Sequence, residues 1–184
     1  MLNQGKSTLM RNLFSFGIII LCYLSCTLVN AEEEAPLEIS KDWSSYKCYV
    51  VTGAIEMLAF KNGEKLSKVS RDKGRLYVQM NDPKTKAIEV TYFAGFPLRA
   101  ASQAALNVDK TTKYVMSSHP EPTSTEEKSY AWSHPNDDKS ILESLKKGET
   151  AIVESTSHTG KVIKDTFALS GFTASFNFMK NACN

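Results

Sequence analysis

Apolar and polar side chains alternate along several short segments of this chain, and this period of two is typical of β-strands with one buried face. Segment 75–80 alternates strictly, and segment 86–93 places Ile88, Val90 and Tyr92 on one face. Between the two segments lies Asn-Asp-Pro, which is a turn signal. The pattern therefore predicts an antiparallel hairpin.

Further segments carry the same β signal. Residues 47–52 are rich in β-branched and aromatic side chains and stop at a glycine, so they predict a strand. Residues 150–157 and 161–169 flank a His-Thr-Gly turn and predict a second hairpin. Residues 54–60 fit either a strand or a turn of helix. Two shorter strands are expected near residues 105–108 and 113–116.

The apolar period changes to that of a helix in two places. Residues 136–148 begin with acidic side chains and end with Lys146, Lys147 and Gly148, an order that complements the helix dipole. Gly148 is expected to end this helix in the left-handed conformation. The second helical face lies at the C-terminus and consists of Phe172, Phe176, Met179 and Cys183. Mostly antiparallel strands with two short helices are most economically packed as a sandwich.

The longest polar stretch covers residues 117–136 and contains Tyr130 and Trp132 as its main apolar content. It predicts a surface excursion that this aromatic pair pins to the domain. Phe96 and Pro97 form an aromatic-proline turn after the first hairpin. Because aromatic side chains dominate interface anchors, these four residues are the candidates for an interaction surface. The alternative is that they close the ends of the sandwich.

The first 31 residues have the three parts of an export signal. Lys6 and Arg11 make the start positive, an apolar run follows at 13–28, and small residues stand at −3 and −1 of a cut after residue 31. An uncleaved membrane anchor would need roughly 20 apolar residues, and this run has 16. The sequence therefore predicts a signal peptide at 1–31, a disordered leader at 32–42 and a single domain at 43–184 that works outside the cytoplasm.

Removal of the signal peptide changes the charge balance. The full chain has 22 Lys and Arg against 20 Asp and Glu, and two of the cations leave with the signal. The neutral remainder lacks the basic stripe that nucleic-acid binding requires. It also lacks a polybasic patch for anionic lipid. We expect no nucleic-acid partner and no membrane span after cleavage.

Cys48 and Cys183 are the two cysteines that remain after cleavage. In an oxidising compartment an even pair of cysteines predicts a disulfide. Two cysteines do not make a zinc site, which usually has four close ligands. We therefore expect one bridge between the two ends of the domain.

Candidate chemistry is otherwise sparse. His119, His134 and His158 lack the spacing that a metal site needs. No serine lies in a Gly-x-Ser-x-Gly elbow, and no phosphate-binding loop is present. The sequence therefore predicts no catalytic, cofactor-binding or metal-ligating residues and favours a non-enzymatic protein.

Several motifs occur in an ordered set that spans Trp43 to Cys183. The most extended lies at 161–174, with Asp-Thr-Phe-Ala-Leu-Ser-Gly-Phe-Thr-Ala followed by a helix that ends in Asn-Ala-Cys. The others are, in chain order, Asp42-Trp43 with Cys48, Ala94-Gly-Phe-Pro-Leu98, and Lys146-Lys-Gly-Glu-Thr150 with residues 157–160. This ordered set resembles the invasion-associated locus B family of exported alphaproteobacterial proteins.

The resemblance implies an immunoglobulin-like antiparallel β-sandwich, a periplasmic or surface location and, in some members, a link to host-cell invasion. It implies no catalytic residues. The leading hypothesis is an exported protein that acts by binding a protein or envelope component, in envelope function or in host-cell association. The alternative is a periplasmic enzyme or chaperone whose site is assembled from loops.

Overall fold

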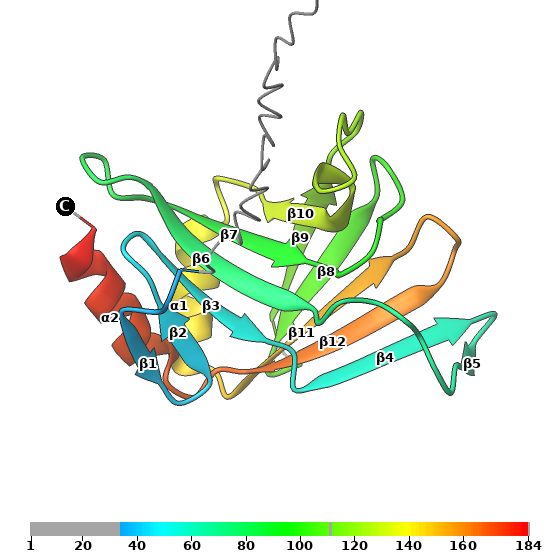
Figure 1. Cartoon of the computed structure of the whole chain (residues 1–184), viewed down its shortest axis with the longest axis horizontal. Helices are drawn as coiled ribbons and strands as arrows, with labels where there is room; N and C mark the ends of the chain where they lie inside the picture. Colours follow the sequence, from blue (N-terminus) through cyan, green and yellow to red (C-terminus); the bar gives the residue numbers. More distant parts are fainter. Residues whose placement is uncertain (1–33, 111, 184) are drawn as a thin grey trace, which may run out of the picture. The chain divides into compact units, whose positions relative to one another are not determined.

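The computed structural model describes residues 34–110 and 112–183, and the secondary structure of this part is mostly β (Figure 1). The helices are α1 (Asp138–Lys147) and α2 (Phe172–Ala182), with a short 3-10 helix η1 (Glu127–Ser129). The strands are β1 (Glu38–Ser40), β2 (Trp43–Ser45), β3 (Tyr49–Gly53), β4 (Glu56–Lys61), β5 (Glu64–Lys65), β6 (Arg75–Asp82), β7 (Ala87–Phe93), β8 (Gln103–Val108), β9 (Thr112–Ser118), β10 (Tyr130–Ser133), β11 (Thr150–Thr156) and β12 (Val162–Ala168).

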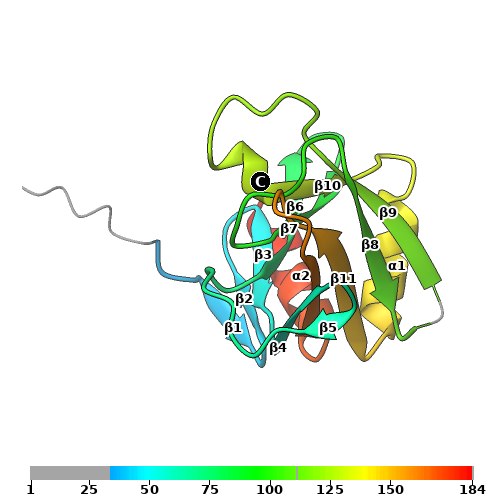
Figure 2. The same ribbon diagram turned by 90° about the vertical axis from the view of Figure 1, so that its right-hand side faces the viewer.

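All these strands belong to one antiparallel sheet with the order β1-β2-β3-β6-β7-β10-β9-β8-β11-β12-β4-β5. The sheet curls so strongly that its two halves face each other across an apolar interior, as the layers of a sandwich do. Figures 1 and 2 show this curled sheet from two directions. The predicted mostly antiparallel, sandwich-like fold with two helices, one of them C-terminal, is confirmed.

The segment from β3 to β4 connects the two halves of the curled sheet. β3 pairs with β6, and after Ala54 and Ile55 the chain continues as β4, which pairs with β12 on the other half of the sheet. The Ala54 N–H donates to the Gly74 carbonyl and the Ile55 N–H to the Thr166 carbonyl, both at 2.8 Å. The closure brings β7 opposite β12, so the sheet encloses one core.

Both predicted hairpins are confirmed. β6 and β7 pair from Arg75 opposite Phe93 onward, with an irregular register near Met80. β11 and β12 pair continuously, beginning with Thr150 opposite Ala168. In each strand the alternate apolar residues face the interior, which is the arrangement that the period of two predicts. Segment 54–60, which fitted two interpretations, is mostly strand β4.

The short strand β1 lies within residues 32–42, for which the sequence predicts a loose leader. It pairs with β2 in an antiparallel register, and the Leu37 N–H donates to the Ser45 carbonyl at 2.8 Å. Regular backbone pairing thus begins before residue 43. β1 is the edge strand of the sheet, and Leu37 and Ile39 are exposed at 55% and 65%.

The C-terminal helix α2 packs on β1, β2 and β3, as its apolar face predicts. Phe172 and Phe176 are buried, and the ring centroids of Phe172 and Trp43 lie 4.7 Å apart. Cys183 follows the helix and forms a disulfide with Cys48, which precedes β3. The predicted bridge is therefore present, and it fastens the end of α2 to the sheet.

Helix α1 is also confirmed, but the prediction for its end is wrong. Gly148 has φ −80° and ψ 165°, which is extended and not left-handed backbone. A Cβ at this position would lie 2.5 Å from Val108 Cγ1 and 3.0 Å from Leu169 Cδ1. Glycine is therefore required here by the close approach of β8 and of the chain after β12, not by backbone conformation.

The prediction of a surface excursion at 117–136 is wrong in part. Residues Tyr130–Ser133 form β10, which lies between β7 and β9 in the middle of the sheet. Only Ala131 and Ser133 of this short strand are buried. Three or four alternating residues inside a polar stretch are too short a signal to reveal a central strand.

The predicted signal peptide, residues 1–31, lies outside the described residues. In the described ranges no helix has the length and apolar character needed to cross a membrane.

Candidate functional site

The outer face of β6, β7 and β10 carries the aromatic pair that the sequence singles out. Ala131 and Ser133 of β10 point inward and are buried, so Tyr130 and Trp132 point outward and are only partly buried. Trp132 lies opposite Thr91 of β7. This parity assigns the outward side chains of the neighbouring strands to the same surface.

Ring contacts extend this surface across the sheet. The centroid of Tyr130 lies 6.0 Å from that of Trp132 and 5.0 Å from that of Phe93. The ring centroids of Tyr77 on β6 and Tyr49 on β3 lie 6.3 Å apart. We call the surface made by Tyr49, Tyr77, Phe93, Tyr130 and Trp132 the aromatic face. Sequence reasoning missed three of its members, because strand parity alone does not show which strands become neighbours.

Two hollows lie on the aromatic face where the loop 124–129 rises beside the sheet. The larger has a volume of about 620 Å³ and is lined by Arg75, Tyr77 and Phe93 among others. The smaller has a volume of about 370 Å³ and includes Trp132. Both hollows are lined by Ser124, Glu126 and Tyr130, so they form adjacent parts of one groove.

Hydrogen bonds hold the loop wall of this groove in place. The Glu127 carboxylate accepts from the backbone N–H of Thr123 at 2.6 Å and from its hydroxyl at 2.8 Å. These bonds hold the pKa of Glu127 below its usual value. In turn the Glu127 N–H donates to the Ser124 hydroxyl at 3.0 Å. These hydrogen bonds are internal to the loop, and a wall that they hold in place loses less entropy on binding.

Phe96 and Pro97 lie in a different environment from Tyr130 and Trp132. The guanidinium of Arg71 stands over the Phe96 ring at 5.5 Å from its centroid. The Pro97 carbonyl accepts from the His158 N–H at 3.0 Å, which ties the turn to the β11–β12 hairpin. Of the four predicted surface residues, the structure brings Tyr130 and Trp132 together and places the other two beside the hairpin tip.

A buried polar network lies between the two halves of the sheet, and the sequence interpretation missed it. Asp165 of β12 is fully buried and pairs with Arg71, whose side chain is 2% exposed. Tyr92 of β7 donates to the same carboxylate at 2.7 Å, and Arg71 also donates to the Ala94 carbonyl at 2.8 Å. The available signal was the charged Asp165 on the apolar face of a strand, between Ile163 and Phe167.

The network changes the titration of Tyr92. Burial raises the pKa of its hydroxyl well above 10, and the charge of Asp165 raises it further. The unfolded chain releases this proton near pH 10. Because the folded state retains the proton, this contribution to stability is fully present below about pH 10 and is lost as the pH rises toward the higher pKa of the folded protein.

The free energy of unfolding is therefore expected to fall above about pH 10, with Tyr92 contributing a slope of at most about 1.4 kcal/mol per pH unit. Urea unfolding between pH 8 and pH 11 measures this slope. The Tyr92→Phe variant should lose less stability over that range than the wild type does. Parallel pH profiles would contradict a raised pKa at Tyr92.

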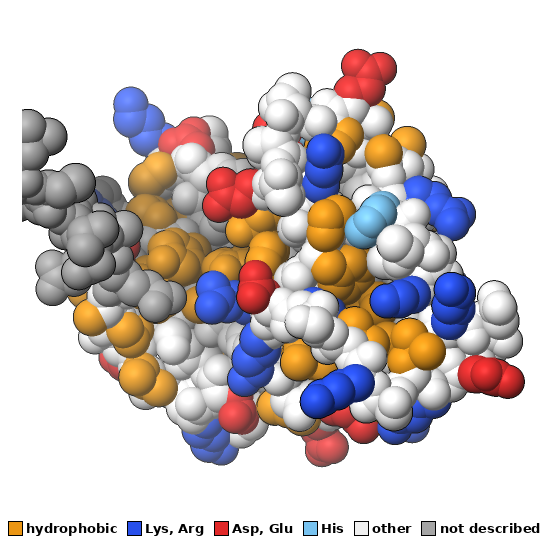
Figure 3. All heavy atoms as spheres, turned by 45° about the vertical axis from the view of Figure 1, so that its right-hand side comes forward, with side chains coloured by type: hydrophobic (Ala, Val, Ile, Leu, Met, Phe, Trp, Pro, Cys, Tyr) orange, Lys and Arg blue, Asp and Glu red, His pale blue; other side chains and the backbone are white. Residues whose placement is uncertain are grey.

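Among the described residues no three His, Cys, Asp or Glu side chains are grouped closely enough to hold a metal ion. His119 and His158 are exposed. On the face that Figure 3 shows, charged side chains of both signs are interspersed with exposed hydrophobic groups. Stacking and hydrogen bonding on the aromatic face are the recognition chemistry that these residues can provide.

The fold and this surface define a disulfide-linked antiparallel β domain with an aromatic groove. The chain belongs to the invasion associated locus B (IalB) family, whose family model matches residues 60–180. The predicted family is therefore confirmed. No curated protein and no solved structure matches the chain significantly.

Proposed function

We propose that this protein is exported to the periplasm or cell surface and acts there without enzymatic activity, by binding a protein or envelope component through the aromatic face. The groove beside Tyr130 carries this proposal, because it combines stacked rings with a rigid polar wall. Tyrosine and tryptophan supply large contact areas and few rotamers, so they are frequent anchors of interfaces.

Family membership and the predicted signal peptide support an exported protein, and the disulfide is consistent with an oxidising compartment. The protein acts either in general maintenance of the envelope or in association with a host cell. The identity of the partner decides which of these two roles it has. The groove is lined by Arg75 and by three acidic residues, Asp72, Glu126 and Glu127. The partner is therefore expected to be polar and not strongly acidic.

The double substitution Tyr130→Ala and Trp132→Ala is expected to lower capture of the partner by tenfold or more, because truncation of anchor residues typically costs about 2 kcal/mol or more. Cross-linking in intact cells followed by affinity purification and mass spectrometry measures the capture. Phe60→Ala is the matched control, since Phe60 is a partly buried aromatic residue on β4, distant in the sheet from β10.

Urea unfolding of both variants shows whether the fold is retained. Unchanged capture by the folded double variant would contradict binding through the aromatic face. An enzymatic product that disappears with a loop substitution would contradict the non-enzymatic role.

A further inference from the structure

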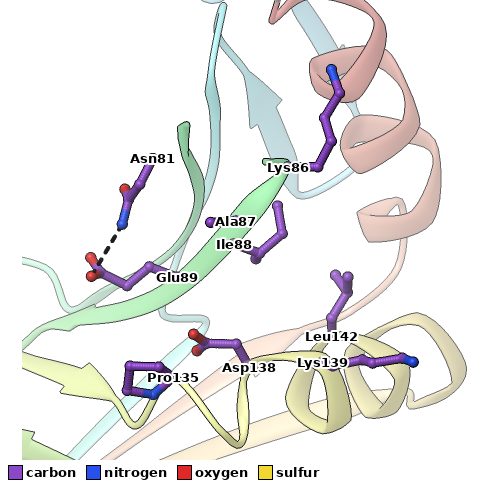
Figure 4. Close-up of a pocket in the computed structure, with 9 residues that line it drawn as sticks. All are labelled: Asn81, Lys86, Ala87, Ile88, Glu89, Pro135, Asp138, Lys139 and Leu142. Carbon is purple, nitrogen blue, oxygen red and sulfur yellow. Dashed lines mark hydrogen bonds between the residues drawn. The ribbon is translucent and has the colours of Figure 1, made fainter. Parts of the chain in front are cut away.

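A second groove lies between β7 and helix α1 and has a volume of about 480 Å³. Figure 4 shows that Asp138 and Leu142 point from α1 toward β7, where Ala87, Ile88 and Glu89 line the opposite side. The groove is therefore bounded by a strand on one side and a helix on the other.

The strand side of this groove is an unpaired sheet edge. β10 pairs with residues 91–93 of β7 only, so the first half of β7 extends beyond its neighbour. The chain of β10 ends at Ser133 and turns at Pro135 into α1. Within the described residues, no strand continues β10 beside Ala87 and Ile88.

The direction of the free backbone groups follows from the register. The Met80 N–H donates to the Cys48 carbonyl on the β3 side, so Met80 and its partner Ile88 are not hydrogen-bonded to each other. In an antiparallel ladder the backbone groups of Ile88 then point away from β6, toward the groove. Val90, two residues on, has the same direction, and its N–H donates to the Ser133 hydroxyl at 3.0 Å. Ile88 thus presents one donor and one acceptor to an added strand.

The side chains of the groove divide it into an apolar part and an anionic end. Ile88 and Leu142 are apolar and partly buried. The Glu89 carboxylate accepts from Gln79 at 2.7 Å, and the buried Asp138 carboxylate accepts from the Ser133 hydroxyl. None of the ion pairs within the described residues includes either carboxylate.

The lysines at the rim do not neutralise this end of the groove. In Figure 4 the amino groups of Lys86 and Lys139 point away from the carboxylates of Glu89 and Asp138. Burial raises the pKa of Asp138, which is the expected effect of a carboxylate that has lost water without gaining a cation. A ligand with a positive group would complement both carboxylates.

We propose that this groove binds a short extended polypeptide segment, which adds to β7 at Ile88 and places a Lys or Arg side chain against Glu89 and Asp138. In strand addition the main-chain hydrogen bonds provide affinity and side-chain pockets provide specificity. The charge of the groove selects the side chain, and its apolar part contacts the methylene stem of that side chain. This site shares no lining residue with the groove of the aromatic face, and it does not depend on the function proposed for that groove.

The probe is the peptide acetyl-Thr-Val-Lys-Val-Thr-amide, titrated into the ¹⁵N-labelled mature protein and followed by NMR. The backbone amide signal of Ile88 should shift most, together with those of its neighbours in β7 and α1. Replacing the lysine of the probe with glutamate or with acetyl-lysine should weaken binding at least tenfold. N-methylation should abolish binding at the one probe N–H that pairs with the Ile88 carbonyl. It should leave binding intact at the two neighbouring positions, whose N–H groups point away from β7.

Protein variants test the same site. Glu89→Gln should weaken binding of the lysine probe by about tenfold, whereas the exposed Glu143→Gln on α1 should leave it unchanged. Tyr130→Ala with Trp132→Ala should also leave it unchanged, so failure of this proposal is distinguishable from failure of the aromatic face.

Three results would overturn strand addition at this groove. The first is equal binding of the lysine and glutamate probes. The second is binding of n-butylamine as tightly as the peptide, which would identify a small amine as the ligand. The third is a dimer in sedimentation experiments with Ile88 at its interface, which would make a second copy of the chain the occupant.

Discussion

Replacing Cys48 and Cys183 together with alanine is expected to lower the free energy of unfolding by about 5 kcal/mol, because the bridge joins residues 135 positions apart. A crosslink over so long a loop removes many conformations from the unfolded chain and therefore stabilises the folded state. The loss is comparable with the whole stability of many domains. Urea unfolding of the variant and of the wild type measures it.

The position of the bridge gives the second reason for a large effect. α2 follows the last strand, and its end is joined through Cys183 to the chain just before β3. Phe172, Phe176 and Met179 remain as apolar contacts when the bridge is absent. We therefore expect α2 to detach first, with hydrogen exchange in the helix rising more than in β6 and β7.

Treatment of the wild type with a reductant is the matched control, since it opens the bridge without substituting any residue. Reduced wild type and double variant should lose similar stability. Mass spectrometry of the oxidised protein should show one Cys48–Cys183 bridge. A double variant with wild-type stability would show that the packing of α2 alone holds the helix.

Asp165→Ala is expected to lower the free energy of unfolding by about 3–5 kcal/mol, because it leaves the guanidinium of Arg71 buried without its counter-charge. Tyr92 loses its acceptor at the same time. A buried donor without a partner costs stability because it has lost its hydrogen bonds to water. Thermal and urea unfolding measure the effect.

A triple variant tests whether the loss in Asp165→Ala comes from buried polar groups left without partners. Arg71→Met combined with Asp165→Leu and Tyr92→Phe removes the three polar side chains and fills the same space with apolar ones, and only the Ala94 carbonyl loses its Arg71 donor. This triple variant should regain most of the stability that Asp165→Ala loses, since apolar replacement of a complete buried network is often close to neutral. A loss below about 1 kcal/mol in Asp165→Ala would contradict the buried network.

Local patterns predicted the strands well where they were long. β6, β7, β11 and β12 each have seven or eight residues with regular alternation, and both of their hairpins are present. β10 has only four residues inside a polar stretch, and its place in the middle of the sheet was missed. The end of α1 was also misjudged, because the constraint on Gly148 comes from β8 and the chain after β12, not from the helix itself.

The candidate surface was predicted only in part for a related reason. The sequence picked out Tyr130 and Trp132 as an aromatic pair, and the structure confirms that their rings lie together. Their role in binding stays a prediction. Tyr77 and Phe93 join them through strand neighbours that are far apart in the chain, and no local pattern contains that information.

By itself the sequence determined the secondary structure of the longer elements, the disulfide partners and the family, since each depends on local periodicity, on residue counts or on ordered motifs. Only the tertiary structure decided which strands became neighbours. That choice made the aromatic face, exposed the edge of β7 beside α1 and brought Arg71 to Asp165, 94 residues away. Such contacts depend on the closure of the whole sheet, because the burial and hydrogen bonds that stabilise them exist only after distant segments have met.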